Sequence, residues 1–461
     1  MAIVNNKKYY FSNYVIFQKL NSEEYVLIHS YLNNIDIIDE FNFKQLLKII
    51  NNQNVQNFDE KVLDELIQKG YLVEDPIEDK KRFLMIAEKL DKNKKSKQLA
   101  YILIPTYNCN FSCPYCFEGN LTRSSNNVLM NREMVDIIFN IIAKDKSEGR
   151  SVSLSLFGGE PLLKENIAIN EYIFEKAKQQ KLKISVITNG YDLDYYISYI
   201  KKNIFSDLQI TLDGDQEQHN RNKFTKSDND TFSKILNNIA LILKTKTKLK
   251  INIRINVNRD NIISLKPLYQ IFENYGFLKD KRFSFYTKSV SEYIGRKDKE
   301  LSDMDIVHEV SFFNDAIKNM ETNSQYAFII KEMNAVFDIK RKFGNFKIKY
   351  CGATGNNRLI DPYGDVYSCL EEVGKKDRRV GFIDKENKLI VNTPLMGEWL
   401  NRDVRSIEEC SNCEYALICG GGCGIAAYRN SNSLQKPWCS QNKEIAKEVI
   451  CEITNRLSKN I

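Results

Sequence analysis

Three cysteines near residue 110 have a spacing that suits an iron–sulfur cluster with one open iron. They are Cys109, Cys113 and Cys116, in the pattern C-x3-C-x2-C. Three thiolates on a cluster whose four irons ordinarily take four ligands leave one iron without a protein ligand. That iron can hold a small molecule and pass an electron directly into it. A zinc knuckle or a coincidental set of cysteines is the alternative that these residues leave open.

The same spacing is the signature of radical S-adenosylmethionine (SAM) enzymes, and the sequence resembles that superfamily. The resemblance implies that Cys109, Cys113 and Cys116 are catalytic and hold a [4Fe-4S] cluster, which chelates the amino and carboxylate groups of SAM. Reductive cleavage of SAM would then yield a 5′-deoxyadenosyl radical, while the protein positions the reacting groups. We expect the electron to come from an external reductant of the flavodoxin or ferredoxin type.

Glycine and polar residues stand where this superfamily binds SAM. Gly158 and Gly159 allow close approach of the backbone to a ligand, and Glu160 offers a carboxylate to an ammonium group. Tyr115 occupies the position where family members carry an aromatic residue against adenine. The other predicted SAM contacts are polar residues at the ends of, or within, later strands: Thr188, Asn189, Thr211 and Arg254. For the first three of these, ordinary capping of a strand end is the alternative.

A second cysteine array occupies the C-terminal third and matches the SPASM domain, which houses auxiliary [4Fe-4S] clusters in peptide-modifying radical SAM enzymes. The resemblance implies an outer cluster and an inner cluster, and therefore three clusters in all. The outer cluster would be held by Cys410, Cys413, Cys419 and Cys439, and the inner one by Cys351, Cys369 and Cys423. Two zinc sites are the alternative.

The number of cysteines bears on the reaction. Two fully ligated auxiliary clusters need eight cysteines, the array supplies seven, and no cysteine lies between Cys116 and Cys351. We therefore expect the inner cluster to keep one iron open, for which a substrate thiolate is a suitable soft ligand. Cys451, in a predicted helix over residues 443–457, is interpreted as a buried bystander, with a role as the eighth ligand as the alternative.

Strands and helices alternate from Leu99 to about residue 286, which predicts an α/β parallel sheet with outer helices. The six predicted strands cover residues 99–105, 153–157, 184–187, 208–212, 251–257 and 282–286. Helical periodicity separates them, for example over residues 134–141 and 231–243. The resemblance implies a (β/α)6 partial TIM barrel, and active sites in such sheets form at the carboxyl ends of the strands.

Residues 1–75 are predicted to form a small α+β module. Apolar runs at 14–17 and 25–28 predict a hairpin. One helix follows from Phe43, capped by Asn42. A second helix runs from about Asp59 to Lys69 and stops at Gly70, before a closing strand. The pattern resembles the winged-helix element that binds leader peptides in ribosomal-peptide modification systems. A mere appendage and a DNA-binding winged helix are the alternatives.

Length and composition set the remaining expectations. A chain of 461 residues should contain several domains. We predict a leader-peptide module over 1–75, a linker over 76–98, the barrel over 99–330 and the SPASM domain over 331–461. No apolar run reaches the ~18 residues of a membrane span. The start lacks the apolar core of a signal peptide, so we expect a cytoplasmic protein without a membrane partner.

Charge and cysteine content narrow the classes further. The net charge of +7 arises from scattered lysines and predicts no nucleic-acid partner. Eleven cysteines beside three histidines favour iron–sulfur clusters over disulfides and over catalytic zinc.

These features predict a radical SAM/SPASM maturase that acts on a ribosomally made precursor peptide with a leader sequence. The open inner iron favours thioether formation, from a peptide Cys sulfur to a carbon, as in the maturases of ranthipeptides and sactipeptides. The alternatives are carbon–carbon crosslinking and the oxidation of Cys or Ser in a sulfatase, which the N-terminal module disfavours. A zinc-rich nucleic-acid-binding protein is the alternative from another class.

Overall fold

The computed structural model describes residues 2–20, 23–32, 34–94, 98–118, 128–257, 260–289, 346–391 and 393–439. The chain divides into two compact units. Of the described residues, the first unit holds 2–94, 346–351 and 401–439, and the second holds those between 98 and 289 and between 352 and 400. No helix within the described ranges is both long and apolar enough to cross a membrane.

Six parallel strands in consecutive order form the main part of the sheet in the second unit. They are β7 (Gln98–Leu103), β8 (Ser151–Leu156), β9 (Ile184–Thr188), β10 (Phe205–Leu212), β11 (Lys250–Val257) and β12 (Phe283–Ser289). All six predicted strands are confirmed, with ends shifted by at most three residues. Because the strands are parallel neighbours, their carboxyl ends lie along one edge of the sheet.

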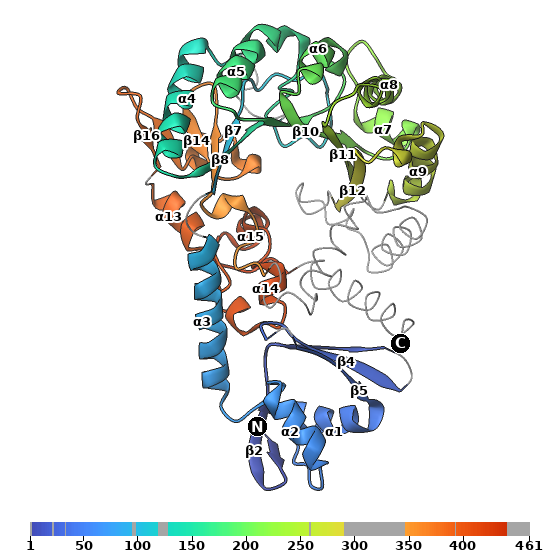
Figure 1. Ribbon diagram of the computed structural model, residues 1–461, viewed down its shortest axis with the longest axis vertical. Coiled ribbons are helices and arrows are strands. Elements are labelled where there is room, and N and C mark those ends of the chain that lie inside the picture. Colours follow the sequence, from blue (N-terminus) through green and yellow to red (C-terminus); the bar gives the residue numbers. More distant parts are fainter. Residues whose placement is uncertain are drawn as a thin grey trace. The chain divides into compact units, whose positions relative to one another are not determined.

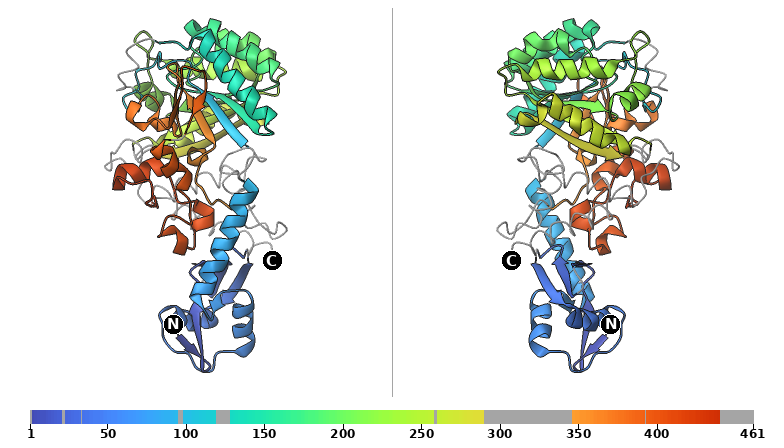
Figure 2. Two further views of the ribbon diagram at one scale, coloured as in Figure 1. Left: turned by 90° about the vertical axis from the view of Figure 1, so that its left-hand side faces the viewer. Right: turned by 90° about the vertical axis from the view of Figure 1, so that its right-hand side faces the viewer.

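Helices connect these strands and lie on their outer side (Figure 1 and Figure 2). They are α4 (Arg132–Ser147), α5 (Ile167–Gln179), α6 (Ile197–Lys201), α7 (Gln216–Asn222), α8 (Thr231–Leu243) and α9 (Leu265–Asn274). The helices predicted over 134–141 and 231–243 are confirmed as α4 and α8. Side chains at the helix start fix both N-termini, since Asn131 accepts from the backbone N–H of Met134 and Asp230 from that of Ser233.

Four short strands that the sequence analysis did not predict extend the same sheet beyond β7. They are β13 (Asn357–Ile360), β14 (Asp365–Tyr367), β15 (Gly381–Ile383) and β16 (Leu389–Ile390). The first pairs in parallel with β7, and the others follow as antiparallel neighbours. Strands of two to four residues are too short to show a clear alternation of apolar and polar residues, which explains why they were missed.

The N-terminal part of the first unit contains two three-stranded sheets and two helices. One sheet joins β1 (Ala2–Val4), β2 (Lys7–Phe11) and β6 (Leu72–Val73), and the other joins β3 (Val15–Lys19), β4 (Glu24–His29) and β5 (Asn34–Asp39). The predicted hairpin is confirmed as β3 and β4, and the closing strand as β6. The strands β1, β2 and β5 were not predicted.

The two helices of this part are α1 (Glu40–Ile50) and α2 (Glu60–Gln68). The predicted limits of α2 are correct to within one residue. The predicted cap of α1 is wrong: Asp39 is the N-cap, and Asn42 donates its backbone N–H and its side-chain amide to the Asp39 carboxylate at 2.7 and 2.8 Å. A carboxylate also complements the positive end of the helix, which an amide does not.

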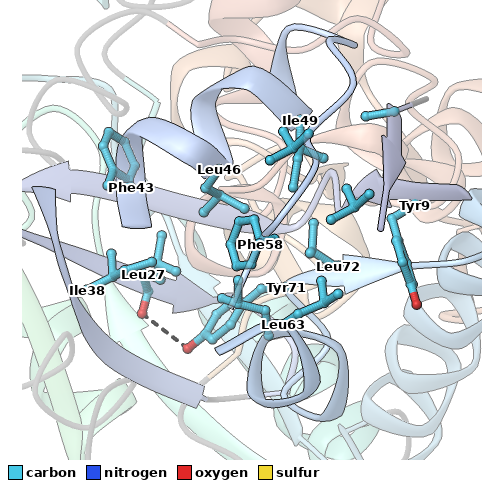
Figure 3. Packing of buried hydrophobic residues seen from close by; sticks show 14 of the residues in the cluster. Tyr9, Leu27, Ile38, Phe43, Leu46, Ile49, Phe58, Leu63, Tyr71 and Leu72 are labelled. Atoms are coloured by element: carbon cyan, nitrogen blue, oxygen red, sulfur yellow. Dashed lines mark hydrogen bonds between the residues drawn. The ribbon is translucent and has the colours of Figure 1, made fainter. Parts of the chain in front are cut away.

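One apolar core joins these sheets and helices (Figure 3). Phe43, Leu46 and Ile49 of α1 pack with Leu63 and Leu66 of α2 and with residues of β4, β5 and β6. At its centre the Tyr71 ring is fully buried, and its hydroxyl donates to the Leu27 carbonyl at 3.3 Å and to the Asp36 carboxylate at 2.6 Å. The polar end of this aromatic residue therefore fixes the ring within the apolar core.

Helix α3 (Pro76–Lys94) occupies most of the predicted linker. Pro76 begins this helix instead of breaking it, since the first helical position needs no N–H donor. On α3, Phe83 stacks on Tyr14 with ring centres 4.5 Å apart, and Asp79 accepts a hydrogen bond from Ser12 at 2.7 Å. The helix is thus a packed element of the first unit.

Three further helices carry or flank the C-terminal cysteines: α13 (Pro394–Asn401), α14 (Ala416–Cys419) and α15 (Gly424–Ser431). The Tyr14 hydroxyl donates to the carbonyl of Ser411, which follows Cys410 directly, at 2.8 Å. The N-terminal sheets and the cysteine segment are therefore parts of one unit. The helix predicted over 443–457 and Cys451 lie outside the described residues.

Candidate functional site

The cysteine triad lies in the loop that leaves the carboxyl end of β7. Backbone hydrogen bonds shape this loop: Cys116 N–H donates to the Cys113 carbonyl at 3.2 Å, and Ser112 N–H to the Phe224 carbonyl at 3.0 Å. Burial raises the pKa of the Cys109 thiol, and the nearby Cys113 and Cys116 raise it further. The three thiols are therefore near enough to interact electrostatically within one loop.

The chemistry of this donor set fits an iron–sulfur cluster. None of the described cysteines forms a disulfide. Ligand thiols must lose their protons to bind, so a raised pKa is expected for buried cysteines without the positive charge of their metal. Within the described residues no group of three or more His, Cys, Asp or Glu side chains is gathered as the ligands of a single metal ion would be.

The two glycines after β8 pack against the cysteine loop. Gly158 and Gly159 have φ of +92° and +49°, and a Cβ on Gly159 would lie 2.2 Å from the carbonyl oxygen of Asn108. The N–H of Glu160 donates to that same carbonyl at 2.7 Å. The close approach that these glycines permit is therefore to the chain's own cysteine loop, whatever further contact they make with SAM.

Glu160 links the ends of β8 and β9. Its buried carboxylate accepts hydrogen bonds from the N–H of Leu162 at 2.9 Å, the hydroxyl of Thr188 at 2.7 Å and the N–H of Asn189 at 2.5 Å. Burial raises the pKa of Glu160 to about 7, although these hydrogen bonds favour the charged form. Contact of this carboxylate with the ammonium group of SAM stays a prediction, since three protein donors already use its oxygens.

Asn189 connects this group of residues to the cysteine loop. Its amide donates to the side-chain oxygen of Asn110 at 2.7 Å and lies 3.9 Å from the sulfur of Cys109. Thr188 also accepts from the N–H of Gly190, so it caps the end of β9 as the alternative interpretation proposed. The structure therefore brings Glu160, Thr188 and Asn189 together beside the first cysteine.

Tyr115 belongs to a polar network that the sequence analysis missed. Its hydroxyl donates to the carboxylate of Asp213, which follows β10 and is almost fully buried. Asn256 donates to the other oxygen of that carboxylate at 3.2 Å, and Arg254 donates to Asn256 at 3.1 Å. Arg254 is also the register partner of Thr211 on β10. The predicted residues Tyr115, Thr211 and Arg254 thus lie around Asp213.

A buried lysine completes this network. The ammonium of Lys223 lies 5.8 Å from the centre of the Tyr115 ring. Burial by itself would lower the pKa of Lys223, but the negatively charged forms of Cys113, Asp213, Cys109 and Cys116 together outweigh that effect and raise it. No motif marks Lys223 in the sequence. Its only signal is its position ten residues after the Asp-Gly turn at Asp213.

The predicted outer cysteines also lie near one another, within the first unit. Burial raises the pKa of Cys410 to about 12 and that of Cys419 to about 11, and in both cases Cys413 and Cys439 contribute. Cys410 and Cys419 therefore each interact electrostatically with the other thiols of the predicted outer set, and four thiols suit a cluster of soft ligands. Cys369, of the predicted inner set, follows β14 in the second unit.

Consecutive glycines shape the loop between Cys419 and Cys423. Gly420, Gly421 and Gly422 have φ of +72°, +88° and +71°. A Cβ on Gly422 would lie 2.0 Å from the carbonyl oxygen of Trp438, next to Cys439. These left-handed turns let the loop lie against the segment that carries the last cysteine.

Comparison with known proteins finds a matching family model for the region of the cysteine triad and relatives that cover most of the chain. Residues 101–233 match the model of a 4Fe-4S single cluster domain. The chain is 23% identical to the radical SAM cyclopropyl synthase TigE of Paramaledivibacter caminithermalis, over 90% of this chain and 85% of that protein. It is 26% identical to a cysteine-type anaerobic sulfatase-maturating enzyme of Clostridium perfringens, over 68% of this chain and 85% of that enzyme.

Among solved structures, that of Streptococcus suis SuiB bound to the precursor peptide SuiA is similar to this one. The likeness has a TM-score of 0.54 at 17% identity and covers 94% of this chain and 99% of that one. The cysteine loop, the parallel sheet and the C-terminal cysteines agree with these comparisons, in which the chain is similar to radical SAM maturases.

Proposed function

We propose that this protein installs thioether crosslinks, from a Cys sulfur to a carbon, in a ribosomally synthesised precursor peptide. When bound, the cluster of the triad would supply the electron that splits SAM and so provides the 5′-deoxyadenosyl radical. The protein's own residues would hold SAM between Tyr115, on the network of Asp213, and the pair of Thr188 and Asn189. The buried Glu160 would keep that pair in place.

The observation that carries the peptide assignment is a groove in the N-terminal part of the first unit. The groove has a volume of about 180 Å³ and is lined by Ile37 and Ile38 of β5 and by Val62 and Leu66 of α2. β5 is an edge strand of its sheet among the described residues, and Ile37 is 47% exposed. An extended leader peptide could add a strand to this edge and place apolar side chains in the groove.

The extent of the comparisons supports the same role. A likeness that spans 94% of the chain necessarily includes most of residues 1–95, and that neighbour is a structure of SuiB with its precursor peptide. The sulfatase-maturating relative matches only 68% of the chain. We therefore favour a peptide with a leader over a sulfatase as the substrate.

The preference for a thioether depends on the ligand count of the inner set. Cys351, Cys369 and Cys423 supply three thiolates, and the remaining cysteines of the described ranges belong to the triad or to the outer set. A substrate Cys would be the soft ligand that completes the inner set and would lie next to the carbon from which hydrogen is removed. Carbon–carbon bond formation is the second candidate, favoured by the match to the cyclopropyl synthase TigE.

Mass spectrometry of the modified precursor distinguishes these reactions. A thioether predicts a loss of two hydrogens that survives reduction and leaves the substrate Cys resistant to alkylation. The same loss with every substrate thiol still free would refute the thioether in favour of a carbon–carbon bond. Oxidation of a sulfatase Cys or Ser, with no change in any precursor peptide, would refute both.

Substitutions in the groove test the leader assignment separately. Ile37→Arg combined with Val62→Arg should raise the KM for full-length precursor at least tenfold and leave SAM cleavage without peptide unchanged. Ile263→Arg is a matched control, because Ile263 is 78% exposed and belongs to the second unit. An unchanged KM in the groove variant would contradict the proposed binding mode.

A further inference from the structure

Arg402 is a buried arginine without an acidic partner in the described part of the chain. Its side chain belongs to the residue after α13 and is 1% exposed. Among the described residues, the guanidinium donates to backbone carbonyls alone: those of Gly421 at 2.8 Å, Gly422 at 3.1 Å, Lys436 at 2.8 Å, and that of Leu434. These bonds satisfy its donors, but carbonyl dipoles leave the net positive charge without a counter-charge.

The carbonyls belong to the two segments that carry cluster cysteines. Gly421 and Gly422 lie between Cys419 and Cys423, and Lys436 lies three residues before Cys439. The negatively charged forms of four cysteines act on the guanidinium: Cys410 and Cys419 of the predicted outer set, and Cys351 and Cys423 of the predicted inner set. Arg402 therefore lies near thiols of both sets.

The neighbouring Arg405 shows what an ordinary arrangement looks like in the same segment. It pairs with Asp91 of α3 at 2.8 Å and also with Asp403, so its charge is neutralised by carboxylates. Burial of an unpaired guanidinium costs several kcal/mol. The groups close to Arg402 that can become anions are cysteines, which bind a cluster as thiolates, and a thiolate-ligated [4Fe-4S] cluster carries net negative charge. The environment of Arg402 is therefore complementary to clusters on these cysteines.

We propose that Arg402 is the shared counter-charge of the two auxiliary clusters and raises their reduction potentials. The inference rests on the auxiliary clusters of the proposed function. A fixed positive charge in a poorly solvated site stabilises the form of a cluster that has gained one electron over the form that has not. The same guanidinium holds the glycine loop against the segment before Cys439, so it acts as a positioning residue as well.

The test uses the full-length chain with Cys109, Cys113 and Cys116 replaced by Ala, so that only auxiliary clusters are observed. The protein is titrated with dithionite under anaerobic conditions and followed by electron paramagnetic resonance. In Arg402→Gln, the ratio of oxidised to reduced cluster at a fixed potential should rise about tenfold, which corresponds to 59 mV for a one-electron couple. Arg402→Lys, which keeps the charge, should retain the original potential.

Arg405→Gln is the matched control. It removes the same formal charge three residues away, but from a pair with carboxylates, and should leave the ratio within about twofold. An unchanged ratio in a fully loaded Arg402→Gln protein would overturn the proposal. An equal shift in Arg405→Gln would also overturn it, because the effect would then not be specific to Arg402.

Iron content is measured for every variant, because the Arg402→Gln protein could fail to bind clusters and would then show no potential. Loading of Arg402→Lys with the original potential, when Arg402→Gln fails to load, supports a requirement for the charge. Failure of both variants to load, or a shifted potential in the Lys variant, overturns the proposal. Absence of iron from the triad variant itself, before Arg402 is changed, refutes the auxiliary clusters and with them this inference.

Discussion

Both cysteine-rich regions place a buried cation close to their thiols, but the two cations are balanced differently. Lys223 lies near Cys113 and shares its surroundings with the carboxylate of Asp213. Arg402 lies near cysteines of both auxiliary sets and, among the described residues, has backbone carbonyls as its hydrogen-bond partners. The positive charge of Lys223 is compensated by a carboxylate of the protein. The positive charge of Arg402 would be compensated by the auxiliary cysteines and the clusters that we propose they bind.

This difference agrees with the tasks that we propose for the two regions. A cluster that must give an electron to SAM needs a low reduction potential, and a carboxylate beside the lysine limits the effect of the positive charge. A cluster that must accept an electron from the substrate benefits from an uncompensated cation. The following changes test the comparison, in order of decreasing expected effect.

Replacement of the triad should abolish the activity of the first cysteine region and leave the iron of the second region unchanged. With Cys109, Cys113 and Cys116 all replaced by Ala, formation of 5′-deoxyadenosine should fall to background, since the residues proposed to hold SAM lie beside the triad and the open iron of the inner set is proposed to take the substrate thiolate. Iron content should fall from about twelve to about eight per chain, because the auxiliary ligands are untouched. Chromatography of the nucleoside and iron analysis measure both. Undiminished SAM cleavage in the triple variant would disprove the assignment of the triad.

Removal of the acid that balances Lys223 should weaken the first site. Asp213→Asn leaves the lysine without its carboxylate and disrupts the bonds to Tyr115 and Asn256. We expect SAM cleavage to fall about 10- to 100-fold, the usual loss when a residue that orients a metal site is changed. We also expect the potential of this cluster to rise, opposite to the change for Arg402→Gln.

The control for that experiment is Asp207→Asn on the same strand. Asp207 lies near the start of β10, where it accepts hydrogen bonds from Ser185 and Ser206. Its replacement should leave SAM cleavage and cluster potential unchanged. Equal losses in the two variants would mean that strand stability, and not the charge beside Lys223, determines the activity.

The first site should also make stability depend on pH through Glu160. Because burial raises the pKa of this carboxyl from 4.5 to about 7, the folded protein retains a proton that the unfolded chain loses. The free energy of unfolding should therefore decline as the pH rises, by roughly 1.5 kcal/mol between pH 5.5 and 7. Glu160→Gln should flatten this part of the profile, measured by thermal unfolding. The exposed Glu165→Gln is the control, and an unchanged slope in Glu160→Gln would contradict the explanation.

The smallest expected effect concerns the contact between the N-terminal sheets and the outer cysteine segment. Tyr14→Phe removes one buried hydrogen bond to the Ser411 carbonyl and keeps the ring that stacks on Phe83. The expected loss is about 1 kcal/mol of stability, seen as a lower Tm, with full iron content. Loss of iron from this variant would show that the contact also positions Cys410.

The sequence determined where the sulfurs and the main strands lie. The spacing of the triad, the C-terminal array and the six parallel strands follow from local patterns, because cluster ligands come at short fixed spacings and buried strands are continuous apolar runs. The positions of Thr188 and Asn189 at the carboxyl end of β9 follow from the same strand pattern, while their contact with SAM stays a prediction. The short strands from β13 to β16 were missed because two to four residues carry no such pattern.

Only the tertiary structure decided how charge is distributed around these sulfurs. Asp213 and Lys223 are ten residues apart in sequence, and Arg402 acts on cysteines from 351 to 423, so no local spacing relates them. The same holds for the cap of α1, where Asp39 and Asn42 are both suitable residues and the direction of one hydrogen bond settles the choice. Burial, which turns an ordinary lysine or arginine into a fixed charge, arises when distant segments pack together.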